Sequence, residues 1–187
     1  MRADARRNRA RVLEAAEAVF SRAGVGASTE EVAREAGVGI GTVFRHFPTK
    51  EALLDALVVQ RVTRFAEAAE RAAGEDEAAS ALQVLVAEVL HQSGQKGAYM
   101  QALIESGRPQ SQALVEAQLR ARAALDGLLG RAQREHAIRD DIQTEDFIAL
   151  TSGLAQAADH GGWSATVQER TVRVLFDGLR ARPQPLR

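Results

Sequence analysis

Residues 28–50 read STEEVAREAGVGIGTVFRHFPTK. The order of polar, apolar and glycine residues in this stretch predicts two short helices joined by a glycine turn. Ser28 and Glu31 have the Ser-x-x-Glu spacing of a capping box, which predicts that the first helix begins here. Its small apolar stripe consists of Val32, Ala33 and Ala36. Gly37 is the predicted end of this helix.

The second short helix is predicted to run from near Ile40 to Phe47. It ends there because Pro48 disfavours a helical conformation at the residue before it. Val43 and Phe47 are four residues apart and therefore face inward together. The outward face holds small residues that allow a close approach and side chains that donate hydrogen bonds: Gly41, Thr42, Arg45 and His46. Two such helices are typical of a helix-turn-helix that binds in a groove of DNA.

The stretch resembles the DNA-binding signature of the TetR family of transcriptional regulators. The resemblance rests on Thr29, Val32, Ala33, Ala36, Gly37, Val38, Gly41, Thr42, Val43, His46, Phe47, Lys50, Leu53 and Leu54. The family usually has a serine where Gly39 stands and a tyrosine where Phe44 stands. The first departure removes a helix cap, and the second removes a hydroxyl that typically meets a DNA phosphate, so that Phe44 offers ring packing alone.

Apolar residues recur with helical spacing along the rest of the chain, and no alternating pattern is long enough to predict a strand. The expected fold is therefore all-α, with about nine helices. Residues 1–48 are expected to form a three-helix DNA-binding domain with a basic N-terminal arm. Residues 49–187 are expected to form a six-helix domain for ligand binding and dimerisation, a layout that the resemblance implies for the whole length.

Individual residues predict where several helices begin and end. The first helix is expected to begin around Arg7 to Arg9 and to end at Gly24 or Gly26. Thr49 is the expected N-cap of the first long helix, and Pro109 the expected first residue of another. The remaining expectations are a short helix between Gly97 and Ser106, a polar connection at 137–143, a cap at Thr144, a stop at Gly161-Gly162 and a final helix at about 165–181.

Composition and charge limit the classes of protein and of site. The 187 residues are 45% hydrophobic, which allows a sizeable core, and they include no cysteine, which excludes disulfides and thiolate chemistry. Neither a secretory signal nor a membrane span is indicated, so we expect a cytoplasmic protein with no membrane partner. Residues 1–50 hold nine Lys and Arg against six Asp and Glu, a balance of +3, whereas residues 51–187 hold fifteen against nineteen, a balance of −4. The basic charge is thus concentrated in the predicted DNA-binding part.

The resemblance and the residue types together assign roles in DNA binding. Gly41 and Arg45 are expected to approach base edges, and Ile40 to touch a thymine methyl. The residues expected to hold phosphates are Thr29, Thr42, His46 and Lys50. Arginines near the N-terminus face only Asp4 as a counter-charge, and Arg6, Arg7 and Arg9 are expected to reach a minor groove. The alternative for these arginines is an unstructured terminus without a DNA contact.

The last two predicted helices are the expected dimer interface, because each has an apolar stripe with small residues that let backbones come close. The expected interface residues are Phe147, Leu150, Leu154, Ala158, Val167, Thr171, Val174, Leu175, Gly178 and Leu179. Family members pair in this way, and a two-fold pair would read a palindromic operator. The alternative is that these stripes only close the core of a monomer.

A ligand cavity between the DNA-binding part and the dimer helices is implied by the resemblance alone. Polar or large residues on apolar helices are the candidates for its lining: Phe65, His91, Tyr99, Met100, Leu103, Gln118, Arg122, Phe147, Leu150 and Trp163. The expected mechanism is repression that an unknown small-molecule effector relieves, by binding better to a conformation in which the two DNA-binding parts are misplaced.

Other functions are weighed against this interpretation. Glu88 and His91 have the spacing of one half of a helical di-metal site, but the other histidines have no matching carboxylate. The glycines at 37, 39 and 41 follow a predicted helix, whereas a dinucleotide loop follows a strand. We therefore expect no catalytic residue, no metal and no cofactor. Two alternatives remain: a DNA-binding nucleoid or division-associated protein on the same scaffold, acting without a small-molecule ligand, and a helical enzyme.

Overall fold

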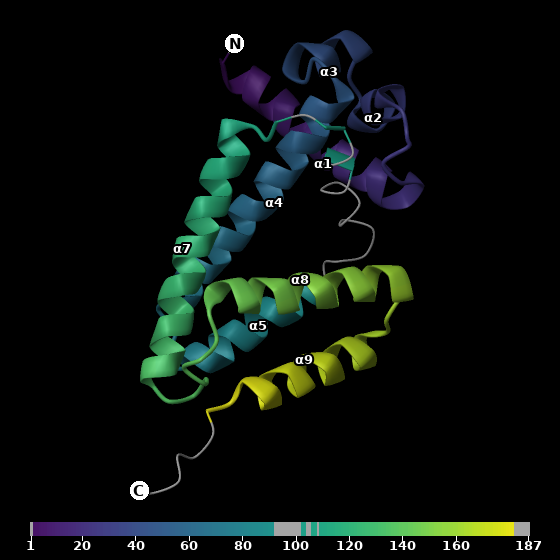
Figure 1. Cartoon of the computed structure of the whole chain (residues 1–187). Helices are drawn as coiled ribbons and strands as arrows, with labels where there is room; N and C mark the ends of the chain where they lie inside the picture. Colours follow the sequence, from purple (N-terminus) through teal and green to yellow (C-terminus); the bar gives the residue numbers. More distant parts are fainter. Residues whose placement is uncertain (1, 92–101, 104–105, 108, 182–187) are drawn as a thin grey trace, which may run out of the picture. The chain divides into compact units, whose positions relative to one another are not determined.

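Eight α-helices make up the part of the chain that the computed structural model describes, which is residues 2–91, 102–103, 106–107 and 109–181 (Figure 1). These residues form no β-strand, and Ile138 and Arg180 make an isolated antiparallel bridge. The expected all-α fold is therefore confirmed. The short helix expected between Gly97 and Ser106 lies mostly outside the described residues. None of the described helices is long and apolar enough to cross a membrane.

The chain divides into two compact units. The first consists of Met1–Arg61 and Gln95–Val115, and the second of Val62–Gly94 and Glu116–Arg187. Two long helices, α4 (Lys50–Ala72) and α7 (Gln112–Arg134), therefore contribute to both units. The expected boundary between residues 48 and 49 stays a prediction.

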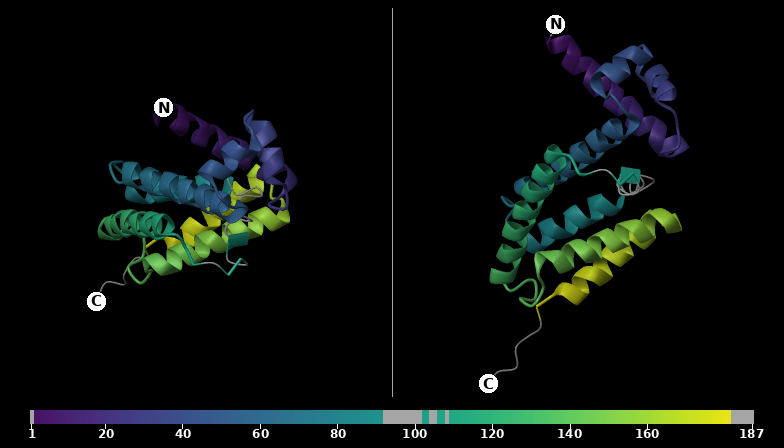
Figure 2. Two further views of the ribbon diagram at one scale, coloured as in Figure 1. Left: turned by 90° about the horizontal axis from the view of Figure 1, so that it is seen from above. Right: turned by 45° about the horizontal axis from the view of Figure 1, so that its top comes forward.

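Three helices form the N-terminal part of the first unit: α1 (Arg2–Ala23), α2 (Thr29–Ala36) and α3 (Ile40–His46). Each of them packs against the other two (Figures 1 and 2). Their shared core consists of Val12, Leu13, Ala16, Val19, Phe20, Val32, Ala33, Ala36, Val43 and Phe47. Burial of each large apolar side chain contributes about 1.5–3 kcal/mol, so this small core is what holds α3 in place.

The free backbone groups at both ends of α2 have hydrogen-bond partners, some within the helix ends and one from α1. The Ser28 hydroxyl accepts from the Glu31 N–H at 3.2 Å, and the Glu31 carboxylate accepts from the Ser28 N–H at 2.9 Å. The predicted capping box is therefore confirmed. Gly37 ends the helix in the left-handed conformation, with φ of 63°. From α1, Nη2 of Arg11 donates to the Ala36 carbonyl at 2.6 Å and so satisfies the end of α2 from outside.

The connection from α3 to α4 follows the expected signals. Phe47 is extended and caps α3, and its side chain is buried in the core. The Thr49 hydroxyl accepts from the Ala52 N–H at 3.1 Å, so the predicted N-cap of α4 is confirmed. At the start of α3, Gly39 makes no side-chain cap, which is the consequence expected of a glycine at this position.

The second unit is built from α5 (Ala78–His91), α8 (Thr144–Gly161) and α9 (Ala165–Leu179), together with parts of α4 and α7. Helix α5 packs against both α8 and α9, which run side by side (Figures 1 and 2). Phe147 of α8 meets Phe176 of α9 edge to face, with ring centroids 6.4 Å apart. The largest fully buried side chains of this unit are Leu82, Leu90, Leu128, Ile138 and Val86.

The start of α1 differs from the expectation, because the helix begins at Arg2 and not around Arg7 to Arg9. Alanine and arginine, which are strong helix formers, dominate this segment. Asp4 lies in the first turn, where the positive end of the helix dipole favours a carboxylate, and it pairs with Arg7 one turn later. The basic residues expected on an arm ahead of the helix are therefore part of the helix.

Two other helix starts are also corrected. Helix α7 begins at Gln112 and not at Pro109, because the Ser111 hydroxyl accepts from the Leu114 N–H at 3.2 Å and supplies the cap. The cap of α8 falls on Gln143 and not on Thr144. The Gln143 N–H donates to the Asp146 carboxylate at 3.0 Å, while Thr144 is buried as the first helical residue.

The connection expected to be polar at 137–143 contains a core residue, Ile138. Backbone hydrogen bonds tie this segment to the end of α9, from the Arg139 N–H to the Leu179 carbonyl at 2.9 Å and from the Ala181 N–H to the Ala137 carbonyl at 3.3 Å. Periodicity did not predict Ile138 as core, because a single apolar residue in a loop has no period.

Candidate nucleic-acid interface

The seven residues of α3 present three different chemistries around its exposed side. Successive residues are turned by about 100° around a helix axis, so residues four apart lie close together on one face. Ile40 and Phe44 form one flank and are 36% and 43% exposed. Gly41 and Arg45 lie at the centre of the exposed side, and Thr42 and His46 form the other flank, half-buried. The face thus has an apolar flank, a central arginine beside a glycine, and a polar flank.

Helix α3 is held by one fully buried side chain, Val43, and by the buried ring of Phe47 at its end. No heavy atom lies within 4 Å of a Cβ added at Gly41, so the surface beside Arg45 is open. A backbone without a side chain at this point allows another molecule to come close to the helix. Arg45 is exposed, and a guanidinium at such a position donates up to five hydrogen bonds.

Two basic side chains next to α3 are placed by aromatic rings of the core. The Arg9 guanidinium lies 5.1 Å from the centroid of the Phe47 ring, and Nζ of Lys50 lies 5.7 Å from the centroid of the Phe20 ring. Cation–π contacts of this kind contribute about 0.5–1 kcal/mol at exposed sites. Arg9 from α1 and Lys50 from α4 are therefore held near the α3 end at Phe47.

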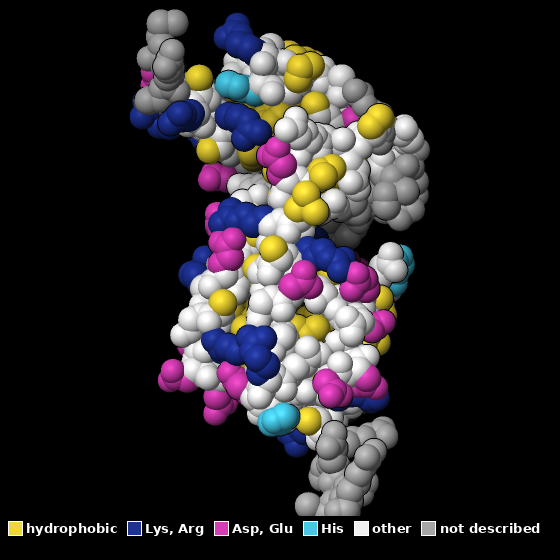
Figure 3. Space-filling model, turned by 60° about the vertical axis from the view of Figure 1, so that its left-hand side comes forward, with side chains coloured by type: hydrophobic (Ala, Val, Ile, Leu, Met, Phe, Trp, Pro, Cys, Tyr) yellow, Lys and Arg dark blue, Asp and Glu magenta, His cyan; other side chains and the backbone are white. Residues whose placement is uncertain are grey.

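The other predicted DNA-binding residues lie on α1 and α2. Arg6 and Arg7 are exposed on α1, and Arg7 pairs with Asp4. Thr29 is half-buried at the first position of α2. In the space-filling view, the upper part of the molecule shows basic side chains close to a histidine and to exposed apolar side chains (Figure 3). The structure thus brings Lys50, Arg9 and the α3 residues onto one part of the first unit.

Arg11 is a contributor that the sequence did not single out. It belongs to the same basic segment as Arg6, Arg7 and Arg9, yet its guanidinium is directed to the end of α2 and stabilises the turn before α3. Only its position could have indicated this role, because Arg11 directly precedes the buried residue Val12 of the apolar stripe.

The residues predicted to line a ligand cavity are not brought together among those described. Arg122 of α7 forms ion pairs with Glu145 and Asp126. The Trp163 ring lies against Gly161, where an added Cβ would be 2.5 Å from Nε1 of the ring. The placement of the others is as follows: Phe65 beside the second unit's core, Gln118 half-buried, His91 and Leu150 exposed, Phe147 fully in the core, and Tyr99 and Met100 outside the described residues.

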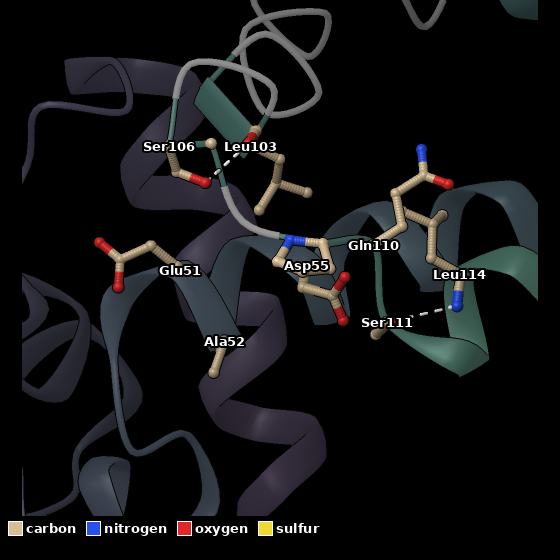
Figure 4. Close-up of a pocket in the computed structure, with 10 residues that line it drawn as sticks. Glu51, Ala52, Asp55, Leu103, Ser106, Gln110, Ser111 and Leu114 are labelled. Carbon is tan, nitrogen blue, oxygen red and sulfur yellow. Dashed lines mark hydrogen bonds between the residues drawn. The ribbon is translucent and has the colours of Figure 1, made fainter.

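A cavity of about 490 Å³ lies within the first unit and includes one of the predicted ligand residues, Leu103. Figure 4 shows its lining, in which Glu51 and Asp55 come from the start of α4 and Ser111 and Leu114 from the start of α7. Carboxylates and hydroxyls surround it together with apolar side chains. The predicted ligand site therefore stays a prediction. No group of three or more potential metal ligands occurs among the described residues.

The residues predicted for a dimer interface separate into two groups by burial. Phe147, Ala158 and Leu179 are buried inside the chain's own core. Val174 is 65% exposed, the largest exposure of any large apolar residue described, and Leu150 and Gly178 are exposed too. The half-buried members are Leu154, Val167, Thr171 and Leu175. An apolar strip along α8 and α9 is thus open on the surface of the second unit.

Comparison with known proteins identifies the family. Residues 12–57 match the model described as bacterial regulatory proteins, tetR family, and residues 77–181 match the one described as transcriptional regulator SbtR-like, C-terminal domain. The chain belongs to the TetR family. A TetR transcription regulatory protein from Mycobacterium vanbaalenii is 38% identical over 96% of this chain and 98% of that one, with a TM-score of 0.74.

Two further structures with the TetR fold are similar. A TetR transcriptional regulator from Streptomyces coelicolor is 30% identical over 94% of this chain and 99% of that one, with a TM-score of 0.72. A gamma-butyrolactone receptor described as ArpA-like is 22% identical over 94% of this chain and 90% of that one, with a TM-score of 0.66, and shows the fold alone. A comparison with curated proteins gave no match. As a member of the TetR family, the chain is a DNA-binding transcriptional regulator, and such regulators are generally not enzymes.

Proposed function

We propose that the protein is a repressor that binds a palindromic operator as a homodimer and is released by a small-molecule effector. The observation that carries the proposal is the exposed face of α3, with Arg45 beside the open surface at Gly41. Arginine forms bidentate hydrogen bonds with guanine in the major groove, which is wide enough to admit a helix. The central part of the face is therefore suited to reading base edges.

Phosphate contacts are assigned to the polar flank and to the basic residues around it. Thr42 and His46 line one side of Arg45, and Lys50 and Thr29 begin the helices on either side of α3. Hydroxyls, imidazoles and ammonium groups bind phosphate oxygens and fix the register of a protein on the duplex without reading its sequence. Arg9, placed on the Phe47 ring, adds a further charge to this set, and Arg6 and Arg7 extend it along α1.

Dimerisation is assigned to the exposed apolar strip of α8 and α9, of which Val174 is the most exposed member. A seven-residue recognition helix touches few base pairs, so a single DNA-binding part gives little specificity. Two such parts related by a two-fold axis read two half-sites about 34–36 Å apart, or a multiple of that distance. The operator of a dimer is consequently a palindrome.

Release of the protein from its operator by an effector follows from the thermodynamic coupling between effector binding and DNA binding. A small molecule that binds better to the conformation with lower DNA affinity shifts the protein toward that conformation, by its differential affinity and no more. A protein of the same fold is a gamma-butyrolactone receptor, which supports a small-molecule site on this scaffold.

Binding to the DNA upstream of the protein's own gene and of the adjacent gene tests the proposal. Fluorescence polarisation with labelled duplexes should show one site that binds at least 10³-fold more tightly than random DNA, as is typical of specific regulators at physiological salt. Transcription from that site should rise when the protein is absent and when the effector is added. Equal affinity for every duplex would contradict the proposal and favour a nucleoid-type protein.

A further inference from the structure

The apolar flank of α3, Ile40 and Phe44, takes no part in the hydrogen bonds to bases and phosphates proposed above. The sequence predicts a thymine-methyl contact for Ile40 and only ring packing for Phe44. Ile40 and Phe44 are large, apolar and more than one-third exposed on a helix of only seven residues. Neither side chain can donate a hydrogen bond to a phosphate or to a polar base edge. Leaving the exposed part of both in water is unfavourable, because each Å² of apolar surface that a partner covers contributes about 25 cal/mol. The pair therefore indicates an apolar partner surface.

The neighbours of this pair indicate what the partner is. Arg45 lies on the same face, and Arg9 and Lys50 lie at the end of the helix, so the apolar pair is bordered by positive charge. A nucleic-acid duplex complements this charge, whereas the apolar surface of another protein would bury these cations without a counter-charge. In the major groove, the only apolar group on a base edge is the 5-methyl group of thymine.

We infer that each operator half-site presents the 5-methyl groups of two neighbouring thymines to Ile40 and Phe44. This inference rests on the proposed function. Residues four apart on a helix have Cβ atoms about 5–6 Å apart. Neighbouring base pairs are stacked about 3.4 Å apart. Ile40 and Phe44 thus span two adjacent base pairs, beside the position that Arg45 reads. Ile40 and Phe44 thus select thymine by apolar contact, whereas Arg45 at the centre of α3 selects its base by hydrogen bonds.

Contact with a thymine methyl also gives a function to the phenylalanine at position 44, where the TetR family usually has a tyrosine. A tyrosine in its place would direct a hydroxyl toward a phosphate, and the ring would then be fixed by the backbone of the DNA. Phe44 has no such constraint and lies on the same flank as Ile40. The exchange therefore converts one backbone contact into one that depends on the base.

Deoxyuridine substitution tests the inference, because it removes the 5-methyl group and leaves base pairing intact. The operator is first selected from a randomised duplex pool with the full-length protein. Each thymine of a half-site is then replaced by deoxyuridine in turn, and the Kd is measured by fluorescence polarisation. Two adjacent positions should each weaken binding about fourfold for every methyl removed, as expected for the loss of one buried methyl group. Thymines outside the half-sites should change the Kd less than twofold.

Ile40→Ala and Phe44→Ala assign each methyl to its side chain. Each variant should bind less tightly and become insensitive to one of the two substitutions, so that the double-mutant cycle gives a coupling of about fourfold. Phe44→Leu, which keeps an apolar side chain, should retain part of the sensitivity. The control is Leu119→Ala, an exposed apolar residue of α7, which should leave affinity and methyl sensitivity unchanged.

Three results would overturn the inference. The first is an operator in which every deoxyuridine substitution changes the Kd less than twofold; specific binding would remain, and the proposed function would stand. The second is a methyl effect of equal size in the wild type and in both alanine variants, which would show that the methyls act through DNA shape. The third is the absence of any selected sequence, which would remove the proposed function as well.

Discussion

At the scale of single residues, Arg45 and Lys50 separate base reading from phosphate binding. Arg45→Ala removes the guanidinium at the centre of the α3 face. We expect the affinity for the operator to fall by about 1–3 kcal/mol, as for the loss of one bidentate base contact. Affinity for random DNA should change little, and competition titrations with both duplexes check this. An equal loss on both would contradict a base-reading role.

Lys50→Ala is expected to act differently, because a phosphate contact carries no sequence information. Affinity for all duplexes should fall by a similar factor. The slope of log Kd against log salt concentration should decrease by about one, since one fewer counterion is released. Titrations at four salt concentrations measure the slope. A loss confined to the operator would instead indicate that Lys50 reads a base.

At the scale of helices, the turn between α2 and α3 depends on the conformation of Gly37. Its φ of 63° is left-handed, and a Cβ there would lie 3.1 Å from Nη2 of Arg11, the arginine that holds the end of α2. Gly37→Ala should therefore lower the free energy of unfolding by about 1–2 kcal/mol. Urea unfolding followed by circular dichroism measures this loss.

Gly26→Ala is the matched control for that turn. Gly26 has no left-handed φ, and no heavy atom lies within 4 Å of a Cβ added there. This substitution should change the free energy of unfolding by less than about 0.5 kcal/mol, or stabilise the protein slightly by restricting the unfolded chain. Equal destabilisation by both substitutions would show that the backbone conformation at Gly37 is not what limits stability.

Helices α4 and α7 are joined within the second unit by a bidentate ion pair. Nε and Nη2 of Arg120 each donate to the Glu70 carboxylate at 2.6 Å, and these hydrogen bonds hold the pKa of Glu70 below its ordinary value. A depressed carboxyl pKa stabilises the fold above the ordinary pKa, and the contribution is lost as the pH falls through the folded value. Carboxyl NMR titration should show a Glu70 midpoint below that of an ordinary glutamate, and Arg120→Ala should raise the midpoint toward the ordinary value.

The control for this titration is Glu145. Its carboxylate accepts from Arg122, which lowers its pKa in the same way, and it is not a partner of Arg120. The Glu145 midpoint should therefore stay low in Arg120→Ala. A parallel rise of both midpoints would indicate that the substitution disturbs the whole unit and not the pair alone.

Helix boundaries show how much the sequence could predict at this scale. The box at Ser28 and Glu31 formed as expected, because both partners lie within one turn and nothing competes with them. Thr144 failed as a cap because its side chain is buried, which leaves the cap to the preceding residue, Gln143. Burial depends on packing with distant segments, so local signals predict a cap only where the competing positions are exposed.

At the scale of the whole molecule, a substitution at Val174 tests the proposal that α8 and α9 form the dimer interface. Val174→Asp places a charge on the most exposed large apolar side chain of α9. We expect dissociation to monomers at micromolar concentration, because the partner helix cannot solvate a buried carboxylate. Operator affinity should fall with it, since one DNA-binding part reads one half-site. Analytical ultracentrifugation measures the mass.

Val84→Asp is the control for that substitution. Val84 is 58% exposed on α5, outside the proposed interface of α8 and α9. This variant should remain a dimer with unchanged operator affinity. Dissociation of the Val84 variant and not of the Val174 variant would place the interface on another helix.

Like the helix boundaries, the candidate site has one part that local sequence predicts and another that depends on packing between distant segments. The outward residues of α3 follow from a period of 3.6, which residues 40–47 contain in themselves. The positions of Arg9 over Phe47 and of Lys50 over Phe20 join segments that are 38 and 30 residues apart, so they depend on how α1 packs against its neighbours. No local pattern contains that information. For the same reason, no pattern in the sequence could identify the lining of a ligand cavity.

The aromatic rings beneath Arg9 and Lys50 connect the interior of the first unit to its affinity for DNA. Long basic side chains lose up to about 2 kcal/mol of rotamer entropy when they are immobilised. A ring that already restrains such a side chain reduces the entropy that remains to be lost when DNA binds. A substitution of Phe47 that preserves the volume of the core but removes the ring is therefore not silent. It leaves the protein folded and frees Arg9, and the free energy of DNA binding becomes less favourable although no residue facing the duplex has changed.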